Sequence, residues 1–203
     1  QVFGSAIHAF AAKMVLEPET TREQLIDSLQ SSWKLIDPES GWVSASHLES
    51  AVTMLEKFVE YHKGTKRDVK GAELRFDVKL GRARIMGTVD RLEVAADGSL
   101  FIIDFKTGNT AISKDDAKKN LQLASYQLGV AEGGFTGSGF AKDTKSSGAE
   151  LVYLGTSSTG ATLRQQYAID LEEIKSTIET IGVGMGAGWI GGLLILVLVI
   201  LAI

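Results

Sequence analysis

The fold is decided by one stretch, residues 72–106, in which apolar and charged residues alternate. It reads AELRFDVKLGRARIMGTVDRLEVAADGSLFIIDFK. Side chains of a β-strand point alternately to opposite faces, so alternation with a period of two predicts strands. Short turn-forming breaks at 81–82 and 96–98 interrupt the alternation. They predict three antiparallel strands, at about 72–80, 83–94 and 99–105, joined by two hairpin loops.

The first loop fixes the alignment of the first two strands. A two-residue hairpin loop pairs Leu80 with Ala83. Because opposed positions in a hairpin keep a constant sum, Glu73 is predicted to lie opposite Asp90. Directly opposed residues have Cβ atoms about 4.5–5.5 Å apart. Two carboxylates are therefore expected side by side.

The second loop adds a third acid to this row. Its three residues pair Ala95 with Ser99, which places Asp90 opposite Asp104. Lys106, two residues beyond Asp104, emerges on the same face. Carboxylates this close repel one another unless a cation lies between them, and hard divalent cations prefer oxygen ligands. The row predicts a divalent-metal site; the alternative is an ordinary solvated polar face.

The apolar residues of the strands support this alignment. The third strand is apolar without interruption over 100–103, which is typical of a strand covered on both faces. A charge in such a strand needs a partner or a metal, so the metal site is favoured over the solvated face. We expect a core on the opposite face, made of Leu74, Phe76, Val78, Ile85, Val89, Phe101, Ile103 and Phe105.

Helical spacing dominates the rest of the chain. Helices are predicted at about 3–16, 20–33, 44–62, 113–130 and 172–180, further strands at 151–154 and 162–169, and a glycine-rich loop at 133–148. The second helix is expected to begin with a capping box of Thr20 and Glu23. The order predicts an α/β fold with a mixed central sheet flanked by helices. We expect one domain over 1–180, with a helical lobe at 1–71 and a catalytic core at 72–180.

Composition limits the class of protein. The chain has 203 residues, of which 23% are charged and 44% hydrophobic, as in a folded globular domain. It has no cysteine, which excludes disulfides, cysteine nucleophiles and an iron–sulfur cluster held by this chain, and suits a cytoplasmic protein. The net charge of −4 argues against a nonspecific nucleic-acid coat, although acidic metal ligands also subtract charge. Because the chain begins at Gln1, we expect it to be a piece of a longer polypeptide.

Residues 181–203 form an uncharged apolar tail whose origin the sequence leaves open. At about 1.5 Å per residue, a helix of this length could span the ~30 Å core of a bilayer. Glycines in its first half weaken a helix, and flanking basic residues are lacking. Packing against protein, or a foreign end, is therefore favoured over membrane anchoring.

Four motifs in order resemble a known family. They are GSAIH (4–8), GTVDR (87–91), IDFKTG (103–108) and QLASY (122–126). Together they closely resemble the RecB-type nucleases of the PD-(D/E)xK superfamily, and most of all the C-terminal domain of actinobacterial UvrD-like helicase-nucleases of the AdnAB type. Relatives often carry four cysteines around an iron–sulfur cluster, which this chain lacks.

The resemblance implies roles for the motif residues. Asp90, Asp104 and the main-chain carbonyl of Phe105 would hold Mg²⁺ or Mn²⁺, and His8 would add a ligand from the first helix. Lys106 would position or polarise the attacking water and offset the charge that grows on the phosphate. Asp90, Asp104 and Lys106 would thus be the catalytic residues.

Four further residues are expected around this centre. Gln122 and Tyr126, one helical turn apart, would contact the DNA strand or steady the site. Glu73 resembles the acidic residue on the family's first strand. With Arg91, it would support the metal ligands; the alternative for Glu73 is a second-metal ligand.

The implied function is metal-dependent DNA cleavage, as an exonuclease, in DNA end processing and recombinational repair. No GxxxxGK[ST] loop occurs in the chain, so helicase motor domains are expected on a preceding part of the polypeptide, and a second helicase-nuclease subunit could join them. A nucleoid-associated, cytoplasmic location follows. The alternative is a catalytically inactive, nuclease-like DNA-binding module, but an inactive relative should lack Asp90, Asp104 or Lys106.

Overall fold

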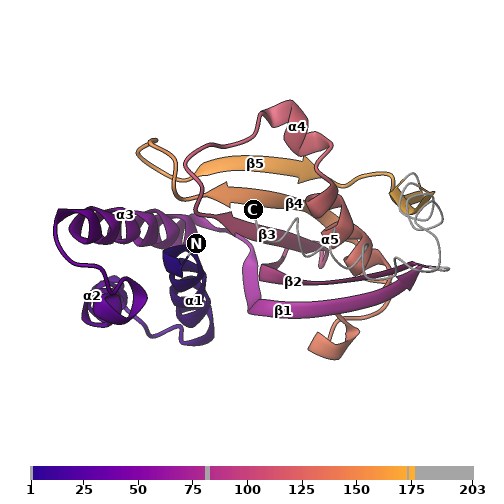
Figure 1. Cartoon of the computed structure of the whole chain (residues 1–203). Coiled ribbons are helices and arrows are strands. Elements are labelled where there is room, and N and C mark those ends of the chain that lie inside the picture. Colours follow the sequence, from indigo (N-terminus) through magenta and orange to yellow (C-terminus); the bar gives the residue numbers. More distant parts are fainter. Residues whose placement is uncertain (1, 81–82, 173, 177–203) are drawn as a thin grey trace. The chain divides into compact units, whose positions relative to one another are not determined.

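The computed structural model describes residues 2–80, 83–172 and 174–176, and it has the predicted α/β fold (Figure 1). Its sheet has five strands in the order β1-β2-β3-β4-β5. The strands are β1 Asp68–Leu80, β2 Ala83–Val94, β3 Leu100–Lys106, β4 Ser146–Tyr153 and β5 Thr162–Tyr167. The helices are α1 Val2–Leu16, α2 Arg22–Ile36, α3 Trp42–Gly64, α4 Lys114–Lys118, α5 Leu121–Ala131 and the 3₁₀ helix η1 Thr136–Ser138.

The predicted register of the first hairpin is confirmed. Leu80 pairs with Ala83, and the same alignment continues to the pair of Gly71 with Leu92, beyond which it shifts by one residue. Loop residues 81–82 lie outside the described part of the chain. Ala72 pairs with Arg91 and Leu74 pairs with Val89, which brings Glu73 opposite Asp90, as the sequence predicts.

The register of the second hairpin is also confirmed. Val94 pairs with Leu100, and Arg91 pairs with Ile103. Gly98 has the left-handed φ of 83° that its loop position requires. The pairing of β2 with β3 is given from Val94 and Leu100 to Arg91 and Ile103, and the pairing of Asp90 with Asp104, one residue further along each strand, stays a prediction.

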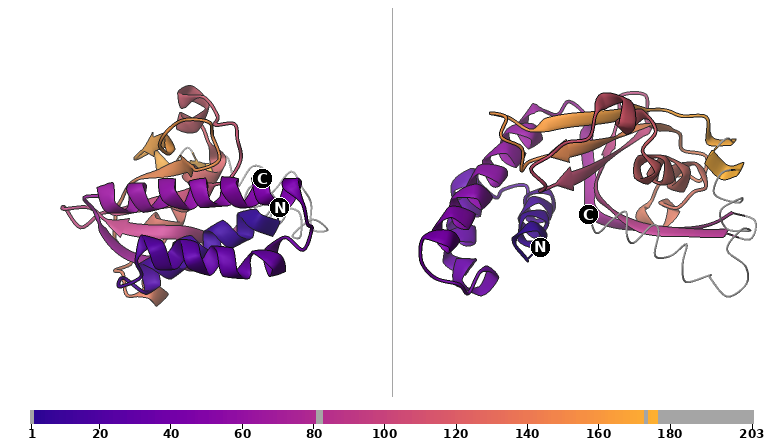
Figure 2. Two further views of the ribbon diagram at one scale, coloured as in Figure 1. Left: turned by 90° about the vertical axis from the view of Figure 1, so that its left-hand side faces the viewer. Right: turned by 45° about the horizontal axis from the view of Figure 1, so that its top comes forward.

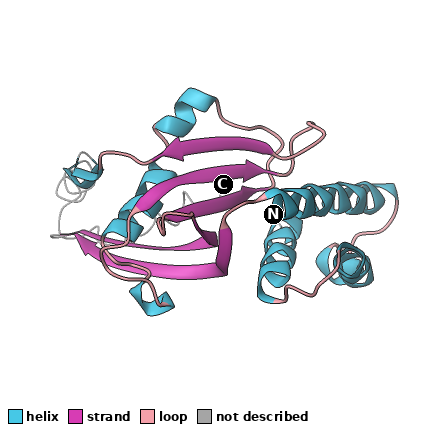
Figure 3. Ribbon diagram, turned by 180° about the vertical axis from the view of Figure 1, so that it is seen from behind, coloured by secondary structure: helices cyan, strands magenta, loops and turns pink. Residues whose placement is uncertain are grey.

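The predicted separation of core and carboxylates is wrong for Phe76. The ring of Phe76 packs edge-on against Tyr126 of α5, with ring centroids 6.0 Å apart, and the hydroxyl of Tyr126 donates to Asp104. Phe76 and Asp104 therefore both face α5. The extended geometry of β1 is interrupted at Glu73, whose φ of 53° is left-handed, so strict alternation does not continue through it. The figures show a sharp bend in β1 (Figures 1 and 3).

The sheet is mixed because β3 and β4 run parallel. The amide of Leu100 donates to the carbonyl of Lys145, and the amide of Leu154 donates to the carbonyl of Lys106, each at 2.8 Å. The connection between β3 and β4 carries α5 across one face of the sheet. Seen from behind, the strands lie in front of this helix (Figure 3).

The helix predicted over 113–130 is in fact two helices. Ser113 caps the short α4, and the side chain of Asn120 accepts from the amide of Leu123 to begin α5. At the junction, the buried Gln166 of β5 donates to three main-chain carbonyls, at 3.0–3.2 Å. The main-chain carbonyls at the end of α4 thus receive hydrogen bonds from a side chain that is distant in the sequence. The local sequence pattern does not predict this partner.

Contacts divide the chain into two compact units. Among the described residues, the first unit holds those up to Lys66 with Phe105–Ala111 and Val152–Leu163. The second unit holds the described residues of Arg67–Asp104, Ile112–Leu151 and the described part that begins at Arg164. In the first unit α3 lies alongside α1 and α2 (Figure 2), around a core that includes Ile7, Leu25, Leu29, Leu55 and Phe58.

Three smaller expectations have different outcomes. The capping box of α2 uses Thr21 and Gln24, not the predicted Thr20 and Glu23. The segment predicted as a loop at 133–148 contains η1 and the start of β4. Of the helix predicted at 172–180, residues 172 and 174–176 are helical, and the rest lies outside the described residues.

The apolar tail at 181–203 also lies outside the described residues. Among the helices of the described part, none is long and apolar enough to cross a membrane.

Candidate metal centre

Two acids on neighbouring strands bring their carboxylates together. Glu73 of β1 and Asp90 of β2 each place a carboxylate oxygen within 4.8 Å of the other. Glu73 is exposed and Asp90 is half-buried. Oxygen donors at this spacing suit a hard divalent cation, which takes several carboxylate and carbonyl ligands.

The backbone at Glu73 is strained. A left-handed conformation in a residue other than glycine costs about 1–3 kcal/mol, and such residues cluster at functional sites. In β1 the strain falls on the residue whose carboxylate meets Asp90. The strained conformation therefore favours a Glu73 side chain that is directed toward Asp90 over one that is simply solvated.

The third acid, Asp104, is held by two buried donors from α5. Its Oδ1 accepts from Nε2 of Gln122 at 2.7 Å and from the hydroxyl of Tyr126 at 2.9 Å. Gln122 also donates to the oxygen of Tyr126 at 2.8 Å, so the three side chains form a closed triangle. All three are at most 5% exposed. The arrangement fixes the orientation of the Asp104 carboxylate.

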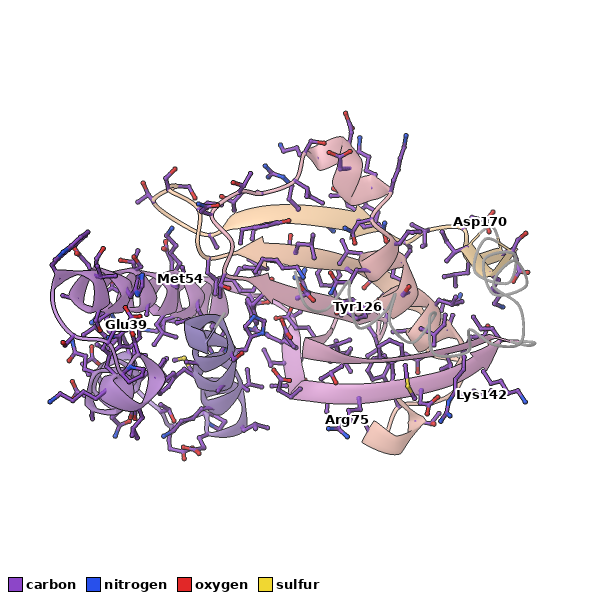
Figure 4. The ribbon with its side chains drawn as sticks, in the orientation of Figure 1. Glu39, Met54, Arg75, Tyr126, Lys142 and Asp170 are labelled. Atoms are coloured by element: carbon purple, nitrogen blue, oxygen red, sulfur yellow. The ribbon has the colours of Figure 1, made fainter. Side chains whose placement is uncertain are left out.

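Tyr126 is kept neutral within this triangle. Burial raises the pKa of its hydroxyl well above the ordinary value, and the nearby charges of Asp104 and Asp90 raise it further. A neutral hydroxyl remains a hydrogen-bond donor, and bonds to an ionised carboxylate are stronger than bonds between neutral groups. Figure 4 shows Tyr126 on α5, over the strands. Of the two predicted roles of Gln122 and Tyr126, this geometry favours steadying the site.

The end of β3 carries Phe105 and Lys106. The ring of Phe105 packs edge-on against Phe58 and Tyr61 of α3, with centroid distances of 5.1 and 6.0 Å. Lys106 is half-buried, and its carbonyl accepts from the amide of Leu154 at 2.8 Å. The main chain from which the Lys106 side chain extends is therefore fixed on both sides.

Arg91 lies in a cluster of buried charges. Both Arg91 and Glu93 have fully buried side chains, and they form an ion pair with a nitrogen–oxygen distance of 2.5 Å. Glu93 also accepts from Nε of Arg67 at 2.6 Å, and the guanidinium of Arg67 lies 3.8 Å from the ring centroid of Phe101. The sequence analysis identified Arg91 but missed Glu93. An acid two residues beyond an arginine in a strand lies on the same face, and this spacing could have predicted the ion pair.

The predicted site residues fall in both units. Glu73, Asp90, Asp104, Gln122 and Tyr126 lie in the second unit. Phe105 and Lys106 directly follow Asp104 in β3 and belong to the first unit, as does His8, half-buried on α1. The role of His8 as a ligand stays a prediction from the sequence.

Acids thus lie on adjacent strands of a mixed sheet, and an Asp-x-Lys sequence stands where the central strand β3 ends. A family model for the PD-(D/E)XK nuclease superfamily matches residues 1–190, and the chain belongs to this superfamily. No curated protein matches the chain. A solved structure titled "Crystal structure of SSO0001" is similar with a TM-score of 0.35 and 15% sequence identity, over 80% of this chain and 71% of that one.

Proposed function

We propose that this chain is a nuclease domain that hydrolyses DNA phosphodiester bonds with the help of Mg²⁺ or Mn²⁺. One observation carries the proposal: the carboxylates of Glu73 and Asp90 lie within 4.8 Å of each other in a member of a nuclease superfamily. Two like charges at this distance favour a cation between them. The domain that we propose spans 1–180.

The donor set fits a hard divalent ion. Asp90 and Asp104 offer carboxylate oxygens, and Glu73 offers another, which are the ligands that Mg²⁺ and Mn²⁺ take. The carbonyl of Phe105 and the imidazole of His8 join them on the strength of the sequence motifs alone. When bound, the ion supplies Lewis-acid activation of the phosphate and of the attacking water.

The chain's own residues then have distinct roles. The ammonium group of Lys106 donates hydrogen bonds to the attacking water or to a phosphate oxygen, and it offsets negative charge that develops there. Gln122 and Tyr126 hold Oδ1 of Asp104, so that this carboxylate keeps one orientation. Arg91 supports β2 beside Asp90 through its buried ion pair with Glu93.

The order of the four sequence motifs supports a finer assignment. We propose a RecB-type nuclease that acts exonucleolytically on DNA ends during recombinational repair. Helicase motor domains on a preceding part of the polypeptide, and a second helicase-nuclease subunit, would be its partners in the cytoplasm at the nucleoid. The inactive DNA-binding module is less favoured, because Asp90, Asp104 and Lys106 are all present.

A cleavage assay tests the proposal. The purified chain is incubated with end-labelled linear DNA, single- and double-stranded, in Mg²⁺, in Mn²⁺ and in EDTA. We expect metal-dependent shortening from the ends, with covalently closed circular single strands left intact. Cutting of the circles would contradict the exonuclease assignment. A folded chain that binds DNA but cuts nothing in either metal would support the inactive module instead.

A further inference from the structure

Gly155, directly after β4, lies against the main chain at the end of β3. A Cβ added to Gly155 would be 2.1 Å from the carbonyl oxygen of Thr107 and 2.7 Å from that of Gly108. These are backbone atoms, so no flexible side chain can yield to make room. The neighbouring hydrogen bond from Leu154 to the carbonyl of Lys106, at 2.8 Å, draws the two segments this close. Only glycine fits at 155 with the end of β3 in its present place.

A second glycine approaches the same residue from α1. A Cβ on Gly4 would lie 3.0 Å from Oγ1 of Thr107, at the lower edge of what real contacts show. Gly4 and His8 are four residues apart in a helix and so share one face. Thr107 is thus enclosed by Gly4 on α1 and by Gly155 after β4, all within the first unit.

We propose that Gly155 and Gly4 are positioning residues for Lys106, acting through Thr107. A lysine side chain has four rotatable carbons and places its ammonium group accurately only if its own backbone is fixed. Phe105 packs against α3 on one side of Lys106, and on the other side Gly4 and Gly155 approach Thr107 so closely that a Cβ on either would meet it. The inference rests on the proposed function, in which Lys106 acts on the water or the phosphate.

The sequence alone gives no sign of this arrangement. Gly155 opens a loop that reads GTSSTG over 155–160, where a glycine is ordinarily a flexible connector. Its backbone carries no left-handed φ, so a turn does not account for it. The close approach to Thr107 is the physical reason for a glycine at this position.

The test compares three glycine-to-alanine variants. Gly155→Ala must displace the backbone at Thr107, and a displacement of about 1 Å near a reacting group can lower the rate about 100-fold. We expect a fall of that order in kcat, with KM for DNA nearly unchanged. Gly4→Ala should show a smaller fall. Gly64→Ala is the matched control, because a Cβ there meets nothing within 4 Å, and it should behave as wild type.

A rescue separates positioning from general damage. Thr107→Ala removes the Oγ1 atom that a Cβ at Gly4 would meet, so it should restore most of the activity lost in Gly4→Ala. It should not rescue Gly155→Ala, whose clash is with the main-chain oxygen of Thr107. If weaker folding alone caused the loss of activity, the activity of each variant would follow its melting temperature. Thr107→Ala would then not rescue Gly4→Ala selectively. If Gly155→Ala does not fold, the Gly4 and Thr107 pair decides.

A second readout does not depend on catalysis. Competitive acetylation, followed by mass spectrometry, measures how fast Lys106 is labelled relative to the exposed Lys118 of α4. We expect Gly155→Ala to change this ratio severalfold and Gly64→Ala to leave it unchanged. An unchanged ratio in Gly155→Ala, or a kcat within twofold of the control, would overturn the inference. If wild type cuts no DNA, the proposed function fails, and the labelling ratio still decides whether the glycines position Lys106.

Discussion

Acidic side chains have opposite kinds of neighbour toward the two ends of the β1–β2 hairpin. Near the tip, Asp77 accepts from Nε of Arg84 at 2.7 Å and from a second guanidinium nitrogen. The guanidinium group lowers the pKa of the Asp77 carboxyl below its ordinary value. Toward the other end, Glu73 faces another acid, Asp90, with carboxylate oxygens within 4.8 Å.

The difference indicates what each end is for. An acid that faces an arginine is a surface ion pair, of the kind that contributes up to about 1 kcal/mol. Two facing carboxylates repel each other, and natural sequences keep such local conflicts mainly at functional sites. The left-handed backbone at Glu73 adds a second local cost at the same place. The hairpin therefore carries an ordinary ion pair at one end and, as we propose, a binding site for a cation at the other.

The largest expected effect is the loss of cleavage in Asp104→Ala and in Lys106→Ala. Each variant removes a group that acts on charge in the transition state, so we expect a fall in kcat of about a thousandfold. Circular dichroism should show both variants folded. Asp77→Ala, which removes the acid of the hairpin tip, is the control and should cleave as wild type does. Full activity in either site variant would show that the catalytic assignment is wrong.

A smaller effect is expected from Tyr126→Phe. Loss of the hydroxyl removes one of the two hydrogen bonds that α5 donates to Oδ1 of Asp104 and leaves the one from Gln122. Removing a group that orients a metal ligand typically costs 10–100-fold in metal affinity or activity, so we expect a loss of about that size. Titration of Mn²⁺ should show weaker binding, while the Kd for DNA in EDTA stays the same. The reverse pattern, weaker DNA binding with unchanged metal affinity, would mean that Tyr126 contacts the DNA strand.

The smallest effect concerns the pH dependence of stability at the hairpin tip. Because the folded-state pKa of Asp77 is lowered by Arg84, its contribution to stability is complete above the unfolded-state pKa of about 3.9. It is lost as the pH falls through the lower folded-state value. Wild type should therefore melt slightly above Asp77→Asn at pH 7, and the gap should close in strong acid. A gap that widens on acidification would contradict the ion pair.

The strand register could be predicted from the sequence because it depends on local rules. Loop length fixes which residues pair, and the alternation of apolar residues confirms the choice. The pairs of Leu80 with Ala83 and of Val94 with Leu100 follow directly. The meeting of Glu73 with Asp90 is a consequence of that register.

Features that depend on distant residues could not be predicted in this way. The break between α4 and α5 is stabilised by Gln166 of β5, and the need for glycine at 155 comes from Thr107. The left-handed conformation of Glu73 and the contact of Phe76 with Tyr126 are two further features that the sequence pattern does not predict. Gln122 and Tyr126 could be singled out by resemblance, but their common partner Asp104 emerges only from the packing of α5 on the sheet.

The most direct test of the central claim is a set of thermal melts with and without Mn²⁺. A ligand that binds only the folded state stabilises it by about 2.7 kcal/mol at a hundredfold excess over Kd, so wild type should melt higher in Mn²⁺ than in EDTA. Asp90→Asn relieves the repulsion with Glu73 but removes a ligand, so it should be no less stable than wild type in EDTA and gain little from Mn²⁺. Asp77→Asn, at the other end of the hairpin, should respond to Mn²⁺ as wild type does. Equal shifts in wild type and Asp90→Asn would mean that the ion binds elsewhere and that the facing carboxylates are only a polar surface.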